Sequence, residues 1–484
     1  MTDARTNILL ITCDQLRHDW LGCRGADWVH TPNIDALAGR GMVFTQCSSN
    51  SPICTPARIA LATGQMPHQV GSLDNNSYLR FSDRTYYQQL RDAGYRVGCV
   101  GKLDLAKPEL ECGNGALPRT FAWGFTHPVE LLGTMDSVRR PPNPDRQVPE
   151  SLTPRLAPEI LARHADGLPD PGCPYGRWLD ENDMYETFLA DLLACKGSDW
   201  LDRHAHVSDL KEEYYEDRYI ASRSVKWLEE IPKDRPWHLF VSFVGPHDPF
   251  NAPEPYASQF AGAAMPEPIP PAGEGKPAWI RKRAANTGDV SRETILRNRR
   301  QYAARIAAID KGIGELMDQL EAIGQAENTV VILTADHGEL LFDHGLMAKH
   351  CAYETSMRIP LIAAGPGVAR GQSHALVELI DVGSTICDLA GAPRTDPVDA
   401  ESFTAVLAEP ARAHRSECVC IEDAYRAIRT DRWKYIVSLN DTNELYDLQE
   451  DPTEQHNVLA ENRDIAAQLH TRLTNRLMHR GCRR

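Results

Sequence analysis

The chain opens with a short apolar stretch that ends in polar residues, Asn7-Ile-Leu-Leu-Ile-Thr12 followed by Cys13-Asp14-Gln15-Leu16-Arg17. Such a run is typical of a strand buried on both faces, as in a parallel sheet. Open α/β sheets place their functional sites at the carboxyl ends of such strands. Taken alone, Asp14 would equally suit a turn or a helix cap. We therefore expect a buried strand with Asp14 and Gln15 at its carboxyl end.

A second apolar run with a similar ending lies far along the chain. Asn328-Thr-Val-Val-Ile-Leu-Thr334 leads into Ala335-Asp336-His337-Gly338-Glu339. Two such strands would bring acids to one edge of a sheet, and a hard divalent cation prefers oxygen ligands of this kind. A strand-end turn that uses Asp and Gly is the alternative for this stretch on its own. Together the two runs predict that Asp336 and His337 lie near Asp14.

Apolar runs and helical patterns alternate along most of the chain. This alternation predicts an α/β fold with a large mixed, mostly parallel sheet sandwiched by helices. The apolar runs are at residues 7–12, 95–100, 237–244, 328–334 and 359–364, and the helical patterns are near 33–40, 86–93, 213–231, 298–324 and 380–391.

Two proline-rich intervals, at about residues 106–200 and 262–295, interrupt the alternation. The first contains Leu168-Pro-Asp-Pro-Gly-Cys-Pro174, which looks too rich in proline for regular structure. Long irregular insertions often wall an active site. We predict one catalytic domain over residues 1–395 that carries both insertions.

The pentapeptide Cys54-Thr-Pro-Ala-Arg58 combines a nucleophile with a helix start. Pro56 suits the first turn of a helix, whose positive end would face a bound anion. Arg58, one turn further, would pair with the nucleophile or with a substrate oxyanion. A buried, inert cysteine is the alternative for these residues alone.

Cys54 and Arg58 match a known signature. The stretch resembles the C-x-P-x-R motif of the formylglycine-dependent (type I) sulfatase and phosphonate monoester hydrolase family, within the alkaline phosphatase superfamily. The resemblance implies an alkaline-phosphatase-like fold and oxidation of Cys54 to formylglycine by a formylglycine-generating maturase. A hydrated aldehyde carries two hydroxyls, one to attack and one to expel the product.

The resemblance also implies one divalent metal ion, held by Asp14, Gln15, Cys54, Asp336 and His337. Calcium is favoured because the family uses it. Gln15 stands where many sulfatases have a second acid, and His337 stands where they have Asn. Because these changes make the site softer than an all-oxygen cage, manganese or zinc are the alternatives.

Further segments match the family at catalytic and substrate-binding positions. Gly345-Leu-Met-Ala-Lys349-His350 resembles the segment in which a lysine contacts the sulfate, so Lys349 and His350 are candidates. His247 in Pro246-His247-Asp248-Pro249 would hold the anion or protonate the leaving oxygen. Asn75 and Asn76 would line the pocket, although a turn is an equally ordinary use of an Asn pair.

Gly101-Lys102-Leu103-Asp104 corresponds to Gly-Lys-x-His in the family, with Asp104 in place of histidine. We expect Lys102 to bind substrate oxygens. An unperturbed Asp is ionised at pH 7 and is a poor acid. Three alternatives follow: His247 is the acid, burial raises the pKa of Asp104, or the leaving group needs little protonation.

The carboxy-terminal part resembles the smaller subdomain of the same family. Tyr425 to Tyr435 and Glu444 to Leu448 predict a small antiparallel sheet beside a helix. We place this α+β subdomain at residues 396–484.

Composition fits a globular enzyme. The chain has 484 residues, 42% of them hydrophobic, and 52 basic against 67 acidic residues give a net charge of −15, which argues against nucleic acid as a partner. No segment approaches the run of about 20 apolar residues that crosses a bilayer, and the first residues lack a signal-like pattern. We expect a cytoplasmic protein with no membrane partner. Its 13 scattered cysteines predict free thiols.

These observations favour a hydrolase that acts on a small anionic ester. Cleavage of sulfate esters, as by an arylsulfatase, is the first hypothesis. A phosphonate monoester hydrolase or phosphodiesterase of the same family is the alternative. A non-catalytic relative that binds anions is a third, disfavoured by the complete set of nucleophile and ligand residues. A homo-oligomeric assembly stays open.

Overall fold

The computed structural model describes residues 5–478 apart from 110–111, 151–152, 198–199, 272, 274 and 395–397. An eight-stranded sheet forms its centre, with the strand order β10-β2-β9-β8-β1-β7-β3-β4. The strands are β1 (Asn7–Asp14), β2 (Met42–Ser48), β3 (Arg96–Lys102), β4 (His127–Leu131), β7 (Trp237–Pro246), β8 (Thr329–Ala335), β9 (Leu361–Ala364) and β10 (Gly371–Glu378).

The first apolar run of the chain lies in the middle of this sheet. β1 is buried along its whole length and runs parallel to both β7 and β8. Leu10 is paired with Phe240 on one side and Ile332 on the other. β9 is antiparallel to both of its neighbours, β2 and β8. The sheet is therefore mixed and mostly parallel, which confirms the fold predicted from the alternation of runs.

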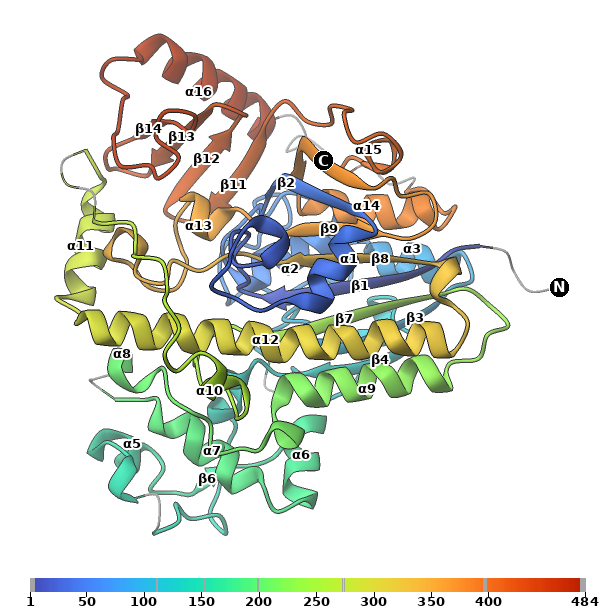
Figure 1. Ribbon diagram of the computed structural model, residues 1–484, viewed down its shortest axis with the longest axis vertical. Helices are drawn as coiled ribbons and strands as arrows, with labels where there is room; N and C mark the ends of the chain where they lie inside the picture. The colour runs from blue at the N-terminus through green and yellow to red at the C-terminus, as the bar shows by residue number, and fades with distance from the viewer. Residues whose placement is uncertain are drawn as a thin grey trace.

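Helices cover both faces of the sheet (Figure 1). On the face toward the viewer, α12 packs on α1, α9 and β7. On the other face, α14 packs against α2 and α3. The bounds are α1 (Pro32–Gly39), α9 (Glu216–Glu230) and α12 (Arg292–Ala322) on the first face, and α2 (Cys54–Thr63), α3 (Tyr86–Asp92) and α14 (Ile380–Leu389) on the second.

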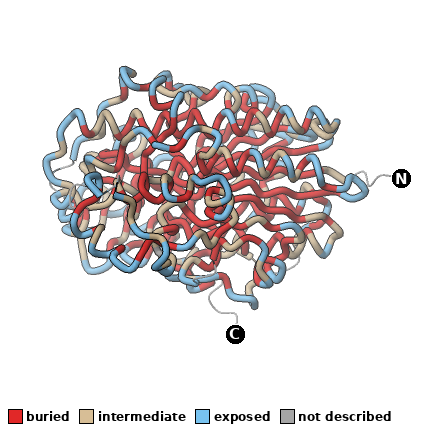
Figure 2. Tube along the Cα trace, turned by 90° about the horizontal axis from the view of Figure 1, so that it is seen from below, coloured by how far each residue is buried: buried red, intermediate tan, exposed pale blue. Residues whose placement is uncertain are grey.

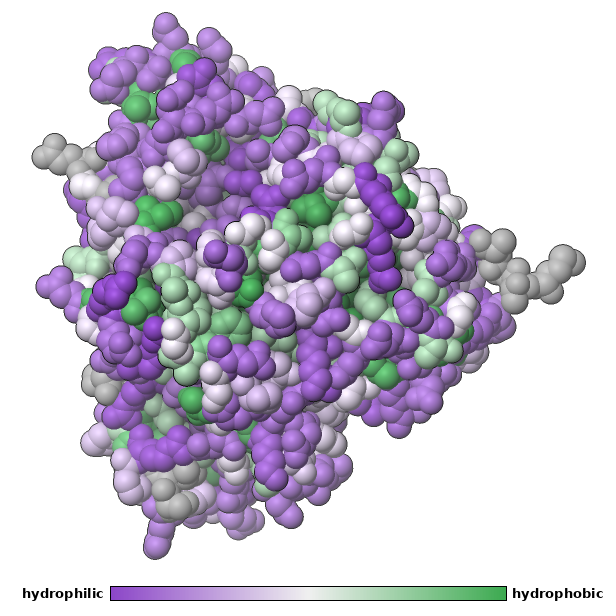
Figure 3. Space-filling model, viewed as in Figure 1, coloured by the Kyte–Doolittle hydropathy of each residue, from purple (hydrophilic) through white to green (hydrophobic). Residues whose placement is uncertain are grey.

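The core follows the sheet and its helical layers. Buried residues run through the middle of the molecule, and exposed ones gather at the rim (Figure 2). The face seen in Figure 1 is covered mainly by hydrophilic residues, with hydrophobic residues in small separate groups (Figure 3). Burial of the apolar runs is the main favourable contribution to folding.

The interval at residues 106–200 is more regular than its prolines suggest. It contains β4, a strand of the main sheet, and several short helices at the bottom of Figure 1. The expectation of irregular structure there was wrong because proline fits the first turn of a helix, where its missing N–H costs nothing. Three helices begin with proline: α4 (Pro118–Ala122), α5 (Pro158–Arg163) and α6 (Pro174–Glu181), the last followed by α7 (Tyr185–Ala194) and α8 (Trp200–Arg203).

The second interval, residues 262–295, is mixed. Residues 265–271 contain neither helix nor strand, and α11 (Ala278–Thr287) and the start of α12 follow. The short α10 (Tyr256–Gln259) precedes this interval. The chain thus returns to helical structure before it reaches β8.

The carboxy-terminal part forms a separate antiparallel sheet with a helix beside it, as predicted. Its strand order is β11-β12-β13-β14, and α16 packs on β12 and β13. The predicted boundary between residues 395 and 396 lies outside the described residues. The elements are α15 (Thr404–Ala408), β11 (Cys418–Glu422), β12 (Tyr425–Arg429), β13 (Trp433–Ser438), β14 (Glu444–Asp447) and α16 (Arg463–Met478), and a third, two-stranded sheet joins β5 (Pro142–Asn143) to β6 (Leu168–Pro169).

The cysteines in the described part of the chain all carry free thiols, and most of them are buried. This agrees with their scattered spacing in the sequence. Among the same residues, no helix is both long enough and apolar enough to span a bilayer.

A buried ammonium group joins the carboxy-terminal sheet to the part of the chain that contains the main sheet. Lys434 in β13 is fully buried, and its Nζ donates to Ala352 O at 2.8 Å. The same Nζ lies 2.7 Å from Glu354 Oε1 and 2.7 Å from Glu454 Oε1. One hydrogen bond to a carbonyl and two ion pairs with carboxylates thus surround this ammonium. Glu354 is the first residue of α13 (Glu354–Met357), which ties this helix to the second sheet.

Replacing Lys434 with methionine should destabilise the protein by about 3–5 kcal/mol, the usual cost of removing one partner of a buried ion pair. Arg429 remains beside Glu354, so the cost falls mainly on the carboxylate of Glu454. The free energy of unfolding in urea measures the effect. Lys226→Met, at an exposed ion pair on α9, is the control and should change stability by less than about 0.5 kcal/mol. Equal stability of the two variants would contradict the role given to Lys434.

Candidate active site

The thiol of Cys54 lies at the carboxyl edge of the main sheet. Cys54 is the first residue of α2, Asp14 is the last residue of β1, and His337 follows the end of β8. Cys54 Sγ is 3.2 Å from His337 Nε2 and 3.8 Å from Asp14 Oδ1. Parallel neighbours end at the same edge, and this is why segments more than 280 positions apart meet there.

Arg58 joins the two acidic residues. Its Nε is 2.8 Å from Asp336 Oδ2, and its Nη2 is 3.2 Å from Asp14 Oδ2. Nη1 donates to Lys102 O at 2.5 Å and to Ser242 Oγ at 2.9 Å. The arginine therefore pairs with carboxylates, whereas the sequence suggested the nucleophile or a substrate oxyanion as its partner.

Lys102 is the second buried cation of the site. Its Nζ donates to Asp14 Oδ2 and lies 3.8 Å from Cys54 Sγ. Burial by itself would lower the pKa of Lys102, but Asp104 and Asp14 raise it well above its usual value. Lys102 is therefore charged and close to the position where an anionic substrate would meet residue 54.

The electrostatics favour ionised carboxylates beside a neutral imidazole. Burial by itself would raise the pKa of Asp14 and of Asp336. The charge of Lys102 outweighs burial at Asp14, and the charge of Arg58 outweighs it at Asp336, so both pKa values are lowered. Burial lowers the pKa of His337, so this ring is neutral at pH 7. His337 Nδ1 donates to Gly338 O at 3.0 Å, which leaves Nε2 as the acceptor that faces Cys54.

These side chains fit a divalent cation. One donor atom from each of Asp14, Cys54, Asp336 and His337 can be chosen so that all four lie within 4.8 Å of one another. Two carboxylates balance a double positive charge, and a neutral imidazole is a metal ligand. Gln15 is beside them: its backbone N donates to Asp336 Oδ1 at 3.0 Å, and its amide contacts Glu339 and Lys349.

His247 and Lys349 form a second group beside this cluster. Lys349 is buried, and its Nζ lies 2.6 Å from His247 Nε2 and also donates to Gln15 Oε1. His247 Nδ1 is 2.8 Å from Asp248 O. Because Lys349 is a donor only, His247 Nε2 accepts here and Nδ1 carries the ring proton. The two candidates thus lie together, next to a candidate metal ligand.

Asp104 does not have the raised pKa that the sequence left as one alternative. It is buried, which would raise its pKa, but Lys102 and Lys107 lower the pKa below its usual value. Their Nζ atoms lie 3.2 and 3.3 Å from Asp104 Oδ2. This alternative was wrong because the aspartate sits between two ammonium groups. His247 and a leaving group that needs little protonation remain.

Of the remaining candidates, Asn75 lies beside Cys54, and Asn76 and His350 have partners elsewhere. Asn75 Oδ1 accepts a hydrogen bond from Thr55 N at 3.1 Å, directly beside the thiol. Asn76 is exposed, and its backbone N donates to Asp74 Oδ1 at 2.9 Å in a local turn. His350 Nδ1 is 2.8 Å from Glu422 Oε1 of β11. The structure thus brings Asn75 to the site and turns His350 toward the second sheet.

Several buried polar residues at the site were not predicted from the sequence. Glu339 Oε1 accepts from Leu341 N at 2.9 Å and from Ala348 N at 2.7 Å, and it shapes the loop that carries Lys349. Ser242 links Arg58 to Thr12 Oγ1, 3.0 Å away. A signal was present in both cases: Ser242 interrupts an apolar strand, and Glu339 precedes the apolar residues 340–342.

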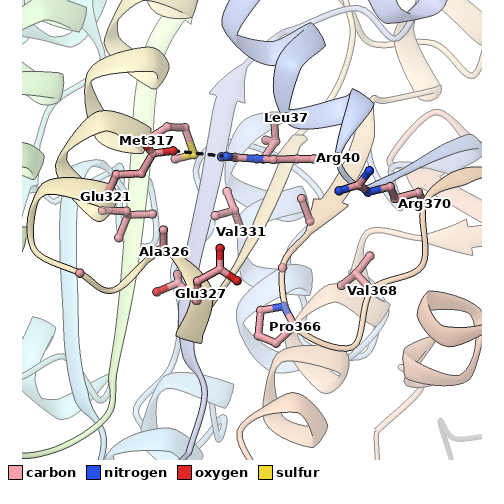
Figure 4. Close-up of a pocket in the computed structure, with 15 residues that line it drawn as sticks. Leu37, Arg40, Met317, Glu321, Ala326, Glu327, Val331, Pro366, Val368 and Arg370 are labelled. Carbon is pink, nitrogen blue, oxygen red and sulfur yellow. Dashed lines mark ion pairs between the residues drawn. The ribbon is translucent and has the colours of Figure 1, made fainter.

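A cavity of about 580 Å³ lies at the opposite edge of the sheet. Its walls include Leu37 of α1, Met317 of α12 and Thr329 at the start of β8, and an ion pair at 3.9 Å joins Arg40 to Glu321 across it (Figure 4). Because β8 begins here and ends at the site, this cavity is separate from the chemical groups described above.

Comparison with known proteins agrees with this geometry. A model of the sulfatase family matches residues 6–392, and a model of the carboxy-terminal domain of N-sulphoglucosamine sulphohydrolase matches residues 342–479. The fold is of the alkaline-phosphatase-like class. The chain belongs to the sulfatase family and is a sulfuric ester hydrolase.

Relatives cover nearly the whole chain. The choline-sulfatase of Rhizobium meliloti is 29% identical over 478 residues, which span 96% of this chain and 84% of the relative. The arylsulfatase of Clostridium perfringens is 24% identical, over a match that spans 94% of this chain and 90% of the relative. Among solved structures, the phosphonate monoester hydrolase of Agrobacterium radiobacter has a TM-score of 0.75 at 22% identity, covering 98% of this chain and 96% of the other. The structural likeness supports the fold.

Proposed function

We propose that this enzyme cleaves sulfate monoesters through a formylglycine formed from Cys54, with the help of one divalent metal ion. The observation that carries the proposal is the meeting of Cys54 with Asp14, Asp336 and His337, all buried, at the positive end of α2. Survival of this complete set argues against a protein that only binds anions.

Two absent groups would supply the central chemistry. A divalent cation held by Asp14, Gln15, Asp336 and His337 would act as a Lewis acid that lowers the pKa of a hydroxyl at residue 54. A hydrated formylglycine would supply two hydroxyls on one carbon, one to attack sulfur and one whose loss of a proton releases sulfate and restores the aldehyde.

The residues of the chain orient these groups and meet the substrate charge. Arg58 fixes the two carboxylates by its contacts at 2.8 and 3.2 Å. Lys102 and Lys349 would bind the non-bridging oxygens as charge moves to the leaving oxygen. We assign protonation of that oxygen to His247, which would first gain a proton at Nε2 and exchange its contact with Lys349 Nζ for the leaving oxygen. Asp104 is the poorer acid because its two lysine neighbours keep it ionised.

Phosphonate monoesters and phosphate diesters are the second candidate substrates. Each carries one negative charge, as a sulfate monoester does, and would meet the same cations. The favouring observation is that Gln15 and His337 occupy ligand positions where, by family resemblance, phosphonate hydrolases have these residue types. A likeness of fold to two phosphonate monoester hydrolases accompanies it.

Parallel kinetics with three substrates test the choice. We expect 4-nitrophenyl sulfate to have a higher kcat/KM than 4-nitrophenyl phenylphosphonate or a bis-aryl phosphate, measured with one enzyme preparation of known formylglycine content. A phosphonate or diester kcat/KM higher by orders of magnitude would overturn the assignment to sulfate esters. Using one preparation removes differences in conversion of Cys54 from the comparison.

A further inference from the structure

The loop that carries Lys349 has an unusual backbone. Ala348 has φ of 64° and His350 has φ of 74°, so the residues on both sides of Lys349 are left-handed without being glycine. L residues other than glycine rarely adopt this conformation, and they persist there only where surrounding contacts enforce it. The position of the Lys349 side chain therefore depends on whatever holds the loop.

One side of the loop is held by the catalytic domain. The carboxylate of Glu339 accepts the hydrogen bond of Ala348 N at 2.7 Å, and Leu340 N donates to Ala348 O at 2.8 Å. These contacts fix the residue before Lys349. The carbonyls of Met347, Lys349 and His350 accept hydrogen bonds from another element.

Arg283 of α11 supplies those donors. Its Nη1 donates to His350 O at 3.0 Å, and its Nη2 donates to Lys349 O at 2.6 Å and to Met347 O at 3.2 Å. One rigid guanidinium thus contacts three carbonyls over four consecutive residues. An arginine presents several donors in a fixed plane, so it stabilises one backbone conformation of the loop better than the single ammonium of a lysine would.

The helix that carries Arg283 is itself anchored on the carboxy-terminal sheet. Asp441 accepts from Ala278 N at 3.0 Å and from Trp279 N at 3.1 Å, at the first turn of α11. The Trp279 ring stacks on Tyr425, with centroids 6.1 Å apart and an interplanar angle of 3°. The second sheet therefore supports α11, and α11 supports the Lys349 loop.

We propose that Arg283 is a positioning residue that holds Lys349 at the substrate anion. The inference deepens the proposed function and depends on it, because it assumes that Lys349 binds the anion. The path runs from Arg283 through the carbonyl of Lys349 to its Nζ, which meets His247 and Gln15. The three side-chain hydrogen bonds of Arg283 described above all go to the loop, and none goes to the cluster around Cys54.

Kinetics of Arg283→Met and Arg283→Lys with 4-nitrophenyl sulfate test the proposal. We expect kcat/KM of Arg283→Met to fall by about 10²-fold, the effect of a small misplacement of a catalytic group. The kcat/KM of Arg283→Lys should lie between those of the wild type and Arg283→Met, since lysine restores the positive charge but not the planar set of donors. Lys282→Met, which removes the exposed neighbouring cation, is the control and should match the wild type. Circular dichroism and the thermal midpoint verify that each variant is folded.

A double-mutant cycle separates positioning from a general loss of structure. If Arg283 acts through Lys349, the Arg283→Met/Lys349→Ala double variant should be no slower than Lys349→Ala alone. The inference would be overturned if the loss of activity in the double variant equalled the product of the two single losses. It would also be overturned if Arg283→Met were as active as Lys282→Met. Wild-type activity of Lys349→Ala would instead overturn the role of Lys349 in the proposed function.

Binding of inorganic sulfate to the metal-loaded enzyme gives a readout without turnover. Calorimetry should show weaker sulfate binding for Arg283→Met and for Lys349→Ala, with similar dissociation constants, and unchanged binding for Lys282→Met. If Arg283→Met binds sulfate as the wild type does while Lys349→Ala binds it more weakly, the positioning role of Arg283 is contradicted and the role of Lys349 is not.

Discussion

Replacement of Cys54 by alanine should abolish sulfate ester hydrolysis and leave the fold intact. Alanine removes the only atom of residue 54 that can become a nucleophile, and loss of a nucleophile costs on the order of 10⁴-fold or more in kcat. The fold should survive because the thiol makes only weak contacts, at 3.2 to 3.8 Å, with its neighbours. Steady-state kinetics and circular dichroism measure the two effects.

A second buried cysteine provides the matched control. Cys47 lies in β2 and is fully buried, outside the cluster of candidate ligands. Cys47→Ala makes a similar small cavity and should retain turnover. Undiminished hydrolysis by Cys54→Ala would exclude the proposed nucleophile. Mass spectrometry of the wild-type peptide around Cys54 reports directly whether the thiol has been converted to an aldehyde.

Replacement of Asp336 by asparagine should have the next largest effect. The change keeps the shape of the side chain but removes one of the two negative charges that would face a bound cation. It also weakens the ion pair with Arg58 Nε, 2.8 Å away. We expect a larger fall in kcat/KM than the 10- to 100-fold typical of an outer partner of a metal ligand. Elemental analysis of the purified variant should show a reduced metal content.

Removal and return of the metal complete that test. A chelator should abolish turnover of the wild type, and added calcium should restore it, with manganese and zinc as the comparison. A stronger recovery with zinc or manganese would show that His337 and Gln15 have shifted the preference of the site. Full metal content and full activity of Asp336→Asn would contradict the assignment of Asp336 as a ligand.

Local sequence patterns were enough to find the central strands. β1 and β8 are short apolar runs, and parallel pairing then requires their polar ends to lie at one edge, so Asp14 and Asp336 could be placed together. The position of β2 in the sheet and the antiparallel direction of β9 could not be predicted, because they depend on pairing between distant segments. The prolines of residues 106–200 were misread because proline both breaks helices and begins them.

The site was predictable to the same degree. Cys54 and Arg58 stand out because a short motif contains both. The partners of Arg58 come from β1, β3, β7 and the residue that follows β8, and they were not evident. Arg283 gave no signal at all: it is one cation on an ordinary helix. Its place is defined only by contacts with a loop more than 60 residues away.

The complete burial of Cys54 has a consequence for how active enzyme is made. Its side chain has no solvent-accessible surface and is covered by the strand ends and by the loop at Asn75. On the proposed formylglycine route, a modifying enzyme would have to act on this thiol before the segments around it fold. The specific activity of a preparation would then depend on the share of chains in which Cys54 is oxidised before folding.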